Sequence, residues 1–265
     1  MPKVKVNDIQ IYYEVKGEGF PLVMINGLGG NLDSWEYYHP LVEELSREFK
    51  LLMFDNRGAG RTDVSDREYT IKLFADDTAG LMNALGISKA HILGISMGGM
   101  IAQELALNHP EKVAGLVLLS TCSGGSKDIQ SSPEVSRTLS ATSEMSQEER
   151  IRVLLPLCLT SDFVKRNSDL VEHVVQVTLK HHIPEEAYMR QLNAVRRFST
   201  YERLRQIKVP TLILHGRKDI LIPPENGSIL AEAIPNAKLV YFAKSAHMLA
   251  EEMGELIEDI TEFLL

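Results

Sequence analysis

The sequence has few cysteines, no excess of positive charge and no long apolar run. Cys122 and Cys158 lie far apart, in no ligand-like spacing, which argues against a disulfide framework or a zinc site and favours a reducing compartment. The formal net charge of −8 disfavours nucleic acid and anionic membranes as partners. No window approaches the roughly 18 apolar residues of a membrane span, and the first residues contain no apolar signal core. We therefore expect a cytoplasmic protein.

What the chain does contain is an alternation of strand and helix patterns. Its 265 residues suffice for one large domain with a sizeable core. Two Val- and Ile-rich runs, 3–6 and 9–15, flank a turn at Asn7 and predict a hairpin. Continuous apolar runs such as PLVMI (21–25) and VAGLVLLS (113–120) then alternate with helical segments, as is typical of strands covered by helices on both faces.

The alternation is interrupted in the middle of the chain. Residues 120–147 are rich in Ser, Thr and Gly and are predicted to form a loop, and only helical patterns follow as far as residue 206. Strand patterns return at TLILHG (211–216) and AKLVYFA (237–243). We interpret this as a parallel α/β core, residues 1–121 and 207–265, that carries an inserted helical cap at 122–206.

One short motif between a strand pattern and a helix pattern points to chemistry. Residues 94–98, GISMG, match G-x-S-x-G, which places a serine on a sharp, strained turn at the carboxyl end of a strand. Glycine at 94 and 98 removes side chains that would collide as strand and helix fold back on each other, so the Ser96 hydroxyl can stand exposed as a nucleophile. The alternative is a glycine-rich turn with an incidental serine, and the strand and helix around the motif disfavour it.

Partners that would activate Ser96 are expected later in the chain, first an acid and then a histidine. Asp219 follows the strand pattern at 211–216, and His247 follows the next strand pattern and is predicted to open the last helix. Both are expected at the carboxyl edge of the sheet, beside the nucleophile. His215 is interpreted as a packed neighbour of the acid loop, and the histidines of the cap are assigned to a solvated helical face: His173, His181 and His182.

Two competing carboxylates, Asp55 and Asp63, lie in the stretch FDNRGAGRTD (54–63). We expect Asp55 and Arg57 to order this loop by hydrogen bonds and an ion pair, which leaves Asp219 as the catalytic acid.

Backbone amides are predicted to bind the negative charge that develops on the substrate oxygen. Such a site takes one N–H from the residue after the nucleophile and one from the loop after an early strand. These residues are Met97 and Leu28, the latter in INGLGG (25–30). A phosphate-binding loop is the alternative for this glycine-rich stretch, but no G-K-[ST] follows and no helix starts immediately.

These stretches together resemble the α/β-hydrolase family, in the branch with a helical cap that holds esterases, enol-lactonases, cofactor-free haloperoxidases and carbon–carbon bond hydrolases. The resemblance implies an α/β-hydrolase fold with a mostly parallel sheet of about eight strands. Asn26 stands where the family usually has His, as in enol-lactonase-like members, and Ala246 stands where it usually has Gly. The first departure leaves the hydrogen bonds of the 25–30 loop unpredicted.

The residues and the resemblance predict a serine hydrolase that cleaves carboxylic esters of small to medium acyl chain through an acyl-enzyme intermediate. A lactonase, enol-lactonase or thioesterase with the same triad is the alternative, and a small-molecule receptor with an intact triad is the alternative from another class. Neither metal nor cofactor is needed for this chemistry. The expected partner is a small-molecule ester, Trp35 is expected to contribute to its pocket, and the expected assembly is a monomer or homodimer.

Overall fold

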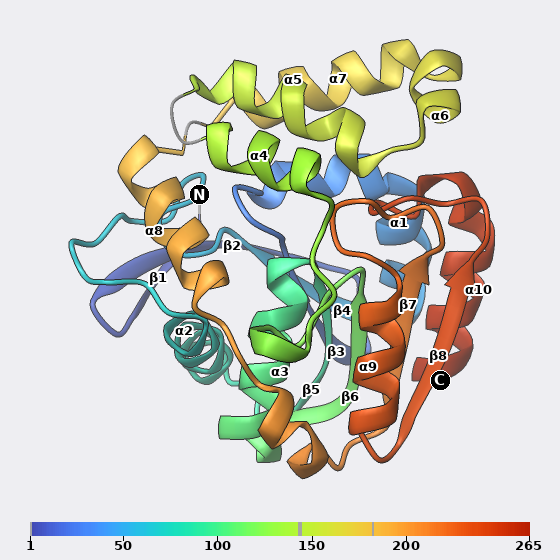
Figure 1. The fold of residues 1–265 in the computed structure, drawn as a ribbon. Coiled ribbons are helices and arrows are strands. Elements are labelled where there is room, and N and C mark those ends of the chain that lie inside the picture. Colours follow the sequence, from blue (N-terminus) through green and yellow to red (C-terminus); the bar gives the residue numbers. More distant parts are fainter. Residues whose placement is uncertain (1, 143–144, 182) are drawn as a thin grey trace.

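The structure contains an eight-stranded sheet with helices on both faces (Figure 1). The computed structural model describes residues 2–142, 145–181 and 183–265. The strand order is β1-β2-β4-β3-β5-β6-β7-β8, and every pair from β4 to β8 is parallel. β1 and β2 form the predicted hairpin, and β2 pairs antiparallel with β4. The prediction of a mostly parallel α/β sheet is confirmed. The strands are β1 (Lys3–Val6), β2 (Ile9–Lys16), β3 (Phe20–Ile25), β4 (Phe49–Phe54), β5 (Ala90–Ile95), β6 (Val113–Leu119), β7 (Thr211–Gly216) and β8 (Ala237–Phe242).

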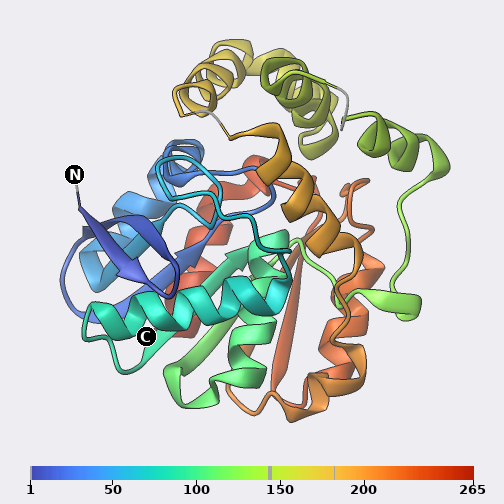
Figure 2. The ribbon, with the colours of Figure 1, turned by 90° about the vertical axis from the view of Figure 1, so that its left-hand side faces the viewer.

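Two apolar clusters, one on each face, hold the helices against the sheet. Helices α2 (Ile71–Ala84), α3 (Met97–Asn108) and α9 (Glu225–Ala233) contribute to one cluster, and α1 (His39–Glu48) and α10 (Met253–Leu264) to the other (Figures 1 and 2). The central strands are buried on both faces, which explains why they are continuous apolar runs in the sequence. In the described part of the chain, no helix is long and apolar enough to cross a membrane.

In the described part of the segment between β6 and β7, five α-helices form a layer over the carboxyl ends of the strands (Figures 1 and 2). We call them the cap helices: α4 (Pro133–Ala141), α5 (Gln147–Cys158), α6 (Ser161–Arg166), α7 (Ser168–Leu179) and α8 (Glu185–Arg196). The prediction of a loop over 120–147 is wrong in its second half, where α4 forms. Ser132 caps α4 by accepting a hydrogen bond from the Val135 amide, and Pro133 begins the helix. The high serine content obscured both of these start signals.

Candidate active site

Ser96 lies on the turn between β5 and α3 in a strained backbone conformation. Its φ is 54° and its ψ is −118°, a region that residues with a side chain rarely adopt. The Thr121 hydroxyl donates a hydrogen bond of 2.8 Å to the Ser96 carbonyl oxygen, and the Ser96 amide donates one of 2.9 Å to the Leu119 carbonyl. Contacts from β6 and the residues that follow it therefore hold the strained turn.

Glycine is required on both sides of Ser96. A Cβ atom at Gly94 would lie 2.2 Å from the Gly98 carbonyl oxygen, which is the predicted collision between strand and helix. A Cβ atom at Gly98 would lie 2.1 Å from the Ile25 carbonyl oxygen at the end of β3. Gly98 thus lets α3 approach the neighbouring strand, a contact that the motif alone did not predict.

Asp219 and His247 meet in the loops that follow β7 and β8. Nδ1 of His247 lies 2.7 Å from Oδ2 of Asp219, and both residues are buried. The other carboxylate oxygen, Oδ1, accepts hydrogen bonds of 2.9 Å from the backbone amides of Leu221 and Ile222. Helix α10 begins only at Met253, so His247 lies in the preceding loop and does not open the last helix as predicted.

His215 brings a second imidazole to the same carboxylate. Its Nε2 lies 2.9 Å from the Ile222 carbonyl oxygen and 3.2 Å from Oδ2 of Asp219. A carbonyl oxygen can only accept, so Nε2 carries the hydrogen. Burial opposes the ionisation of Asp219, but adjacent His247 and the hydrogen bonds from both imidazoles outweigh it, holding the pKa of this carboxyl well below its ordinary range. The prediction that His215 packs against the acid loop is confirmed.

The loop after β3, residues 26–31, lies beside Ser96, and we call it the glycine loop. A Cβ atom at Gly27 would lie 3.3 Å from the Ser96 Cβ atom. Nδ2 of Asn26 donates a hydrogen bond of 2.8 Å to the Asn31 carbonyl and so joins the two ends of the loop. This is the role of the asparagine that stands where the family usually has histidine.

The backbone amides of Leu28 and Met97 lie on the two segments next to Ser96. In the described residues, the N–H groups of Leu28 and Met97 make no hydrogen bond. Met97 is the first residue of α3, and the first amides of a helix have no acceptor within it. These are the two donors that the sequence predicted for a developing oxyanion.

The Ser96 hydroxyl makes no hydrogen bond to His247 among the residues that the structure describes. Hydrogen bonds between nucleophile and base are often long in the absence of substrate, so this geometry does not exclude the pair. The structure thus joins Asp219 to His247 and brings the glycine loop to Ser96, while the contact between Ser96 and His247 stays a prediction.

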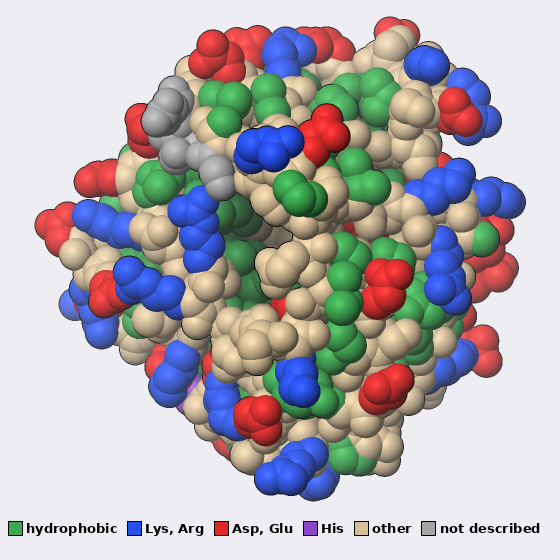
Figure 3. Space-filling model, in the orientation of Figure 1, with side chains coloured by type: hydrophobic (Ala, Val, Ile, Leu, Met, Phe, Trp, Pro, Cys, Tyr) green, Lys and Arg blue, Asp and Glu red, His purple; other side chains and the backbone are tan. Residues whose placement is uncertain are grey.

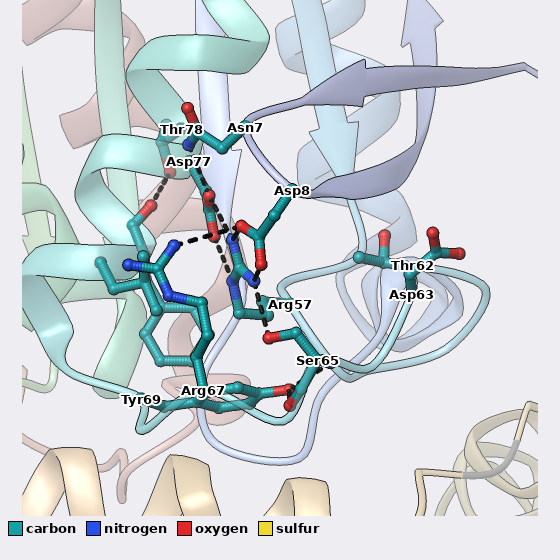
Figure 4. A network of polar contacts seen from close by, with 12 residues as sticks. Asn7, Asp8, Arg57, Thr62, Asp63, Ser65, Arg67, Tyr69, Asp77 and Thr78 are labelled. Carbon is teal, nitrogen blue, oxygen red and sulfur yellow. Dashed lines mark hydrogen bonds and ion pairs between the residues drawn. The ribbon is translucent and has the colours of Figure 1, made fainter.

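The loop at 54–63 has a structural role. Asp55 accepts hydrogen bonds from the amides of Leu32 (2.5 Å) and Arg61 (2.7 Å), although burial raises its pKa. Arg57 pairs with Asp77 and Asp8 (Figure 4), while Asp55 pairs with Arg61, so both residues order the loop as predicted but through partners that the sequence did not indicate. The network therefore ties this loop to α2 and to the hairpin.

Trp35 is 3% exposed, and its ring packs against Tyr38. It lines an outer groove of about 440 Å³ together with His173, and its contribution to a substrate pocket stays a prediction. His173 is exposed, as predicted for the cap histidines. His181 is half-buried and its Nδ1 lies 2.5 Å from Asp33, so its assignment to a solvated face is wrong. His182 lies outside the described residues.

A hollow opens on the face of the molecule shown in Figure 3, between α4, α8 and α3, and hydrophobic side chains form part of its wall. Among the described residues, no group of three or more His, Cys, Asp or Glu side chains could hold a metal ion.

The comparisons with known proteins agree with this architecture. The model of the alpha/beta hydrolase fold matches residues 21–155 and 179–252. The chain is 30% identical to the 2-hydroxy-6-oxononadienedioate/2-hydroxy-6-oxononatrienedioate hydrolase of Burkholderia vietnamiensis over 97% of this chain and 91% of that protein. The enol-lactonase of Burkholderia xenovorans LB400 is similar in structure, with a TM-score of 0.88, 28% identity and 99% coverage of both chains. A thermophilic esterase from Thermogutta terrifontis gives a TM-score of 0.84 at 26% identity, covering 100% of this chain and 98% of that one. The chain therefore belongs to the α/β-hydrolase family, and it is a hydrolase.

Proposed function

We propose that the protein is a carboxylesterase that uses Ser96, His247 and Asp219 as a catalytic triad. The observation that carries this proposal is the buried Asp219–His247 pair, joined at 2.7 Å, at the sheet edge where the strained turn presents a serine. A buried histidine that is hydrogen-bonded to a buried carboxylate is typical of a catalytic base, whereas a histidine with no chemical role needs no such partner.

The mechanism follows from the hydrogen bonds. Because Nδ1 of His247 is bonded to Asp219, its Nε2 is the nitrogen that accepts the Ser96 proton as the hydroxyl oxygen attacks the acyl carbon. The C–O bond of the tetrahedral intermediate then breaks as Nε2 gives the proton to the leaving oxygen, which departs as the alcohol. Water, deprotonated by Nε2, attacks the acyl-enzyme, and return of this proton to the Ser96 oxygen releases the carboxylic acid. Asp219 stays ionised because its pKa is held low, and it stabilises the imidazolium that forms in each half-reaction.

We assign the oxyanion hole to the backbone amides of Leu28 and Met97. Their N–H groups lie on the two segments that flank Ser96, and neither is hydrogen-bonded in the described residues. Donors that are fixed before the reaction stabilise the tetrahedral intermediate without further reorganisation. We also propose that residues 122–206 act as the cap that shapes the acyl pocket, because the cap helices lie over this edge and a hollow with partly hydrophobic walls opens beside them (Figure 3).

A lactonase is the second candidate. The similarity to the enol-lactonase of Burkholderia xenovorans over 99% of both chains supports it. Ring opening needs the same nucleophile, base and oxyanion donors, because a lactone differs from an open ester only in the tether between acyl group and leaving group.

Turnover on a panel of p-nitrophenyl esters and lactones tests these proposals. Many rapid turnovers on the esters are expected, and a clear preference for lactones would favour the second candidate. A single slow acylation without turnover would indicate a receptor. Absence of any reaction of the folded protein with both substrate classes and with a small fluorophosphonate would contradict the proposed serine chemistry.

A further inference from the structure

Helix α8 contacts two loops of the core at positions occupied by glycine. Tyr188 of α8 covers Gly29 of the glycine loop, where a Cβ atom would lie 3.3 Å from the ring. Ala187 covers Gly58, where a Cβ atom would lie 2.9 Å from the Ala187 side chain. Both glycines have positive φ, at 72° and 77°. The backbones of these two loops therefore lie directly against one helix of the cap.

Gln191, one turn further along α8, joins the same two loops by hydrogen bonds. Its Oε1 accepts a hydrogen bond of 3.0 Å from the Gly29 amide, and its Nε2 donates one of 3.0 Å to the Arg57 carbonyl. The side chain is completely buried. Because one partner can only donate and the other can only accept, a single orientation of the amide satisfies both.

Core residues hold most of the remainder of the glycine loop, and Nδ2 of Asn31 also donates a hydrogen bond of 3.3 Å to the His181 carbonyl between α7 and α8. The Asn26 side chain binds the Asn31 carbonyl, Asn56 binds the Asn26 carbonyl at 3.2 Å, and the Gly30 amide binds the Gly27 carbonyl at 3.2 Å. None of these bonds involves the tip of the loop, residues 28 and 29. Among the described residues, the bond from Gly29 to Gln191 is the one hydrogen bond that the tip makes.

From this arrangement we infer that Gln191 is a positioning residue that fixes the Leu28 amide of the oxyanion hole. The inference rests on the proposed function, in which Leu28 supplies one of the two oxyanion donors. Gln191 holds the peptide that follows Leu28, so it limits rotation of the loop tip about the backbone bonds of Leu28 and Gly29. The cap thereby contributes to the rate of the chemical step as well as to the shape of the pocket.

The size of the expected effect follows from the value of an oxyanion donor. Removal of one donor lowers kcat by about 100- to 1,000-fold, and a displaced donor retains part of that contribution. Loss of the Gln191 hydrogen bond should therefore lower kcat by about 10- to 100-fold. A residue that only packed the cap against the core would change stability and KM and would leave kcat nearly unaffected.

The test compares Gln191→Met with Gln103→Met in the full chain. Gln103 is a matched control because it is also completely buried and makes two hydrogen bonds. Its Nε2 donates to the Cys122 carbonyl at 2.9 Å, and its Oε1 accepts from the Thr200 hydroxyl at 2.7 Å, away from the glycine loop. The readouts are kcat and KM for a p-nitrophenyl ester, the rate of Ser96 phosphonylation by a small fluorophosphonate, and Tm.

Both variants are expected to lower Tm, and only Gln191→Met should lower kcat and the phosphonylation rate by tenfold or more. Equal kcat values in the two variants, or a change in KM alone, would overturn the inference. Gln191→Leu, with the same expectation, replaces Gln191→Met if the latter does not fold. The proposed function is tested separately. It holds if the wild type reacts with the ester and the fluorophosphonate while the Ser96→Ala variant reacts with neither, whatever the result for Gln191.

Discussion

The core and the cap each contain an arginine bound to two carboxylates, and the two networks differ in their burial. Arg57 of the core is completely buried and pairs with Asp77 at 2.7 Å and with Asp8 at 2.8 Å (Figure 4). Arg152 of α5 pairs with Glu148 at 2.9 Å and with Glu172 at 2.8 Å, but all three side chains are at least 44% exposed.

The difference indicates how each part of the molecule is held together. A buried pair leaves an uncompensated charge when one partner is removed, whereas an exposed pair exchanges its partner for water. The loop at 54–63 is therefore fixed to α2 and to the hairpin by interactions that water cannot replace. The outer cap helices α5 and α7 are joined at their surface by interactions that water can replace.

The largest effect in the core is expected from replacing Ser96, which should abolish catalysis without lowering stability. Ser96→Ala should lower kcat by about 10⁵-fold or more, because the triad acts as a unit around its nucleophile. Tm should not fall, since the hydroxyl makes no hydrogen bond to another described residue. Ester hydrolysis and thermal unfolding measure the two quantities. A variant that kept more than about a tenth of the wild-type rate would exclude Ser96 as the nucleophile.

Replacing each of two buried aspartates of the core should distinguish a catalytic carboxylate from a structural one. Asp219→Asn should lower kcat by about 10⁴-fold, because the imidazolium of His247 loses its charged partner. Asp55→Asn is the matched control, since Asp55 is equally buried and accepts backbone hydrogen bonds from Leu32 and Arg61. It should destabilise the protein and keep kcat within a few-fold of wild type. The reverse result would make Asp55 the catalytic acid.

The two arginine networks themselves provide the next comparison. Arg57→Met should lower the free energy of unfolding by about 3–5 kcal/mol, because Asp77 would remain buried and unpaired. Arg152→Met should leave it unchanged within error, since all the charged groups of that network are exposed. Urea denaturation of both variants measures the difference. Equal destabilisation would show that burial does not distinguish core from cap.

The carboxylates that accept from these arginines extend the comparison to pH. The hydrogen bond from Arg57 lowers the pKa of Asp8 to about 2, and the one from Arg152 lowers the pKa of Glu172 to about 2. A carboxyl whose pKa is lower in the folded state stabilises the fold above its unfolded pKa, which is about 3.9 for Asp and about 4.3 for Glu, and this contribution is lost as the pH falls through the folded pKa of about 2.

Asp8→Asn should therefore cost up to about 1 kcal/mol at pH 7 and nothing near pH 2, a figure reduced because Asp8 is more than a third exposed. Glu172→Gln should have no effect at either pH, because solvent screens the pair. Chemical denaturation at the two pH values checks both variants. An Asp8→Asn effect that persisted at low pH would mean that packing, and not charge, underlies it.

The smallest expected effects concern the acyl pocket. kcat/KM should rise up to about fourfold for each methylene of the acyl chain until the pocket is full, and then fall. Met189 of α8 is half-buried in a cluster with Leu28 and Tyr188, so Met189→Ala should move the optimum to longer chains. Exposed Leu170 of α7 provides the control. An unchanged chain-length profile in Met189→Ala would place the selecting side chains elsewhere.

Much of the core could be predicted because its signals are local. The buried strands at 21–25 and 113–119 are apolar throughout. The glycines around Ser96 are needed by a single tight turn, so a short motif is enough to identify it. The cap contacts could not be predicted, because each depends on a pairing between distant residues. Glutamine in a helix is usually exposed to solvent, so the sequence does not indicate that Gln191 is buried. It is buried because two core loops present a backbone amide and a backbone carbonyl to its side chain. His181 is similar, since Asp33 reaches it from the core.

The insertion of the cap helices between β6 and β7 also determines the order in which the molecule is completed on the ribosome. Ser96 and the glycine loop emerge early, while Asp219 and His247 emerge after the entire cap. Until β7 is made, the buried strand β6 has an unpaired edge, and such edges promote association between nascent chains. The β6 edge therefore stays open while all five cap helices are synthesised, before the proposed acid and base have been made.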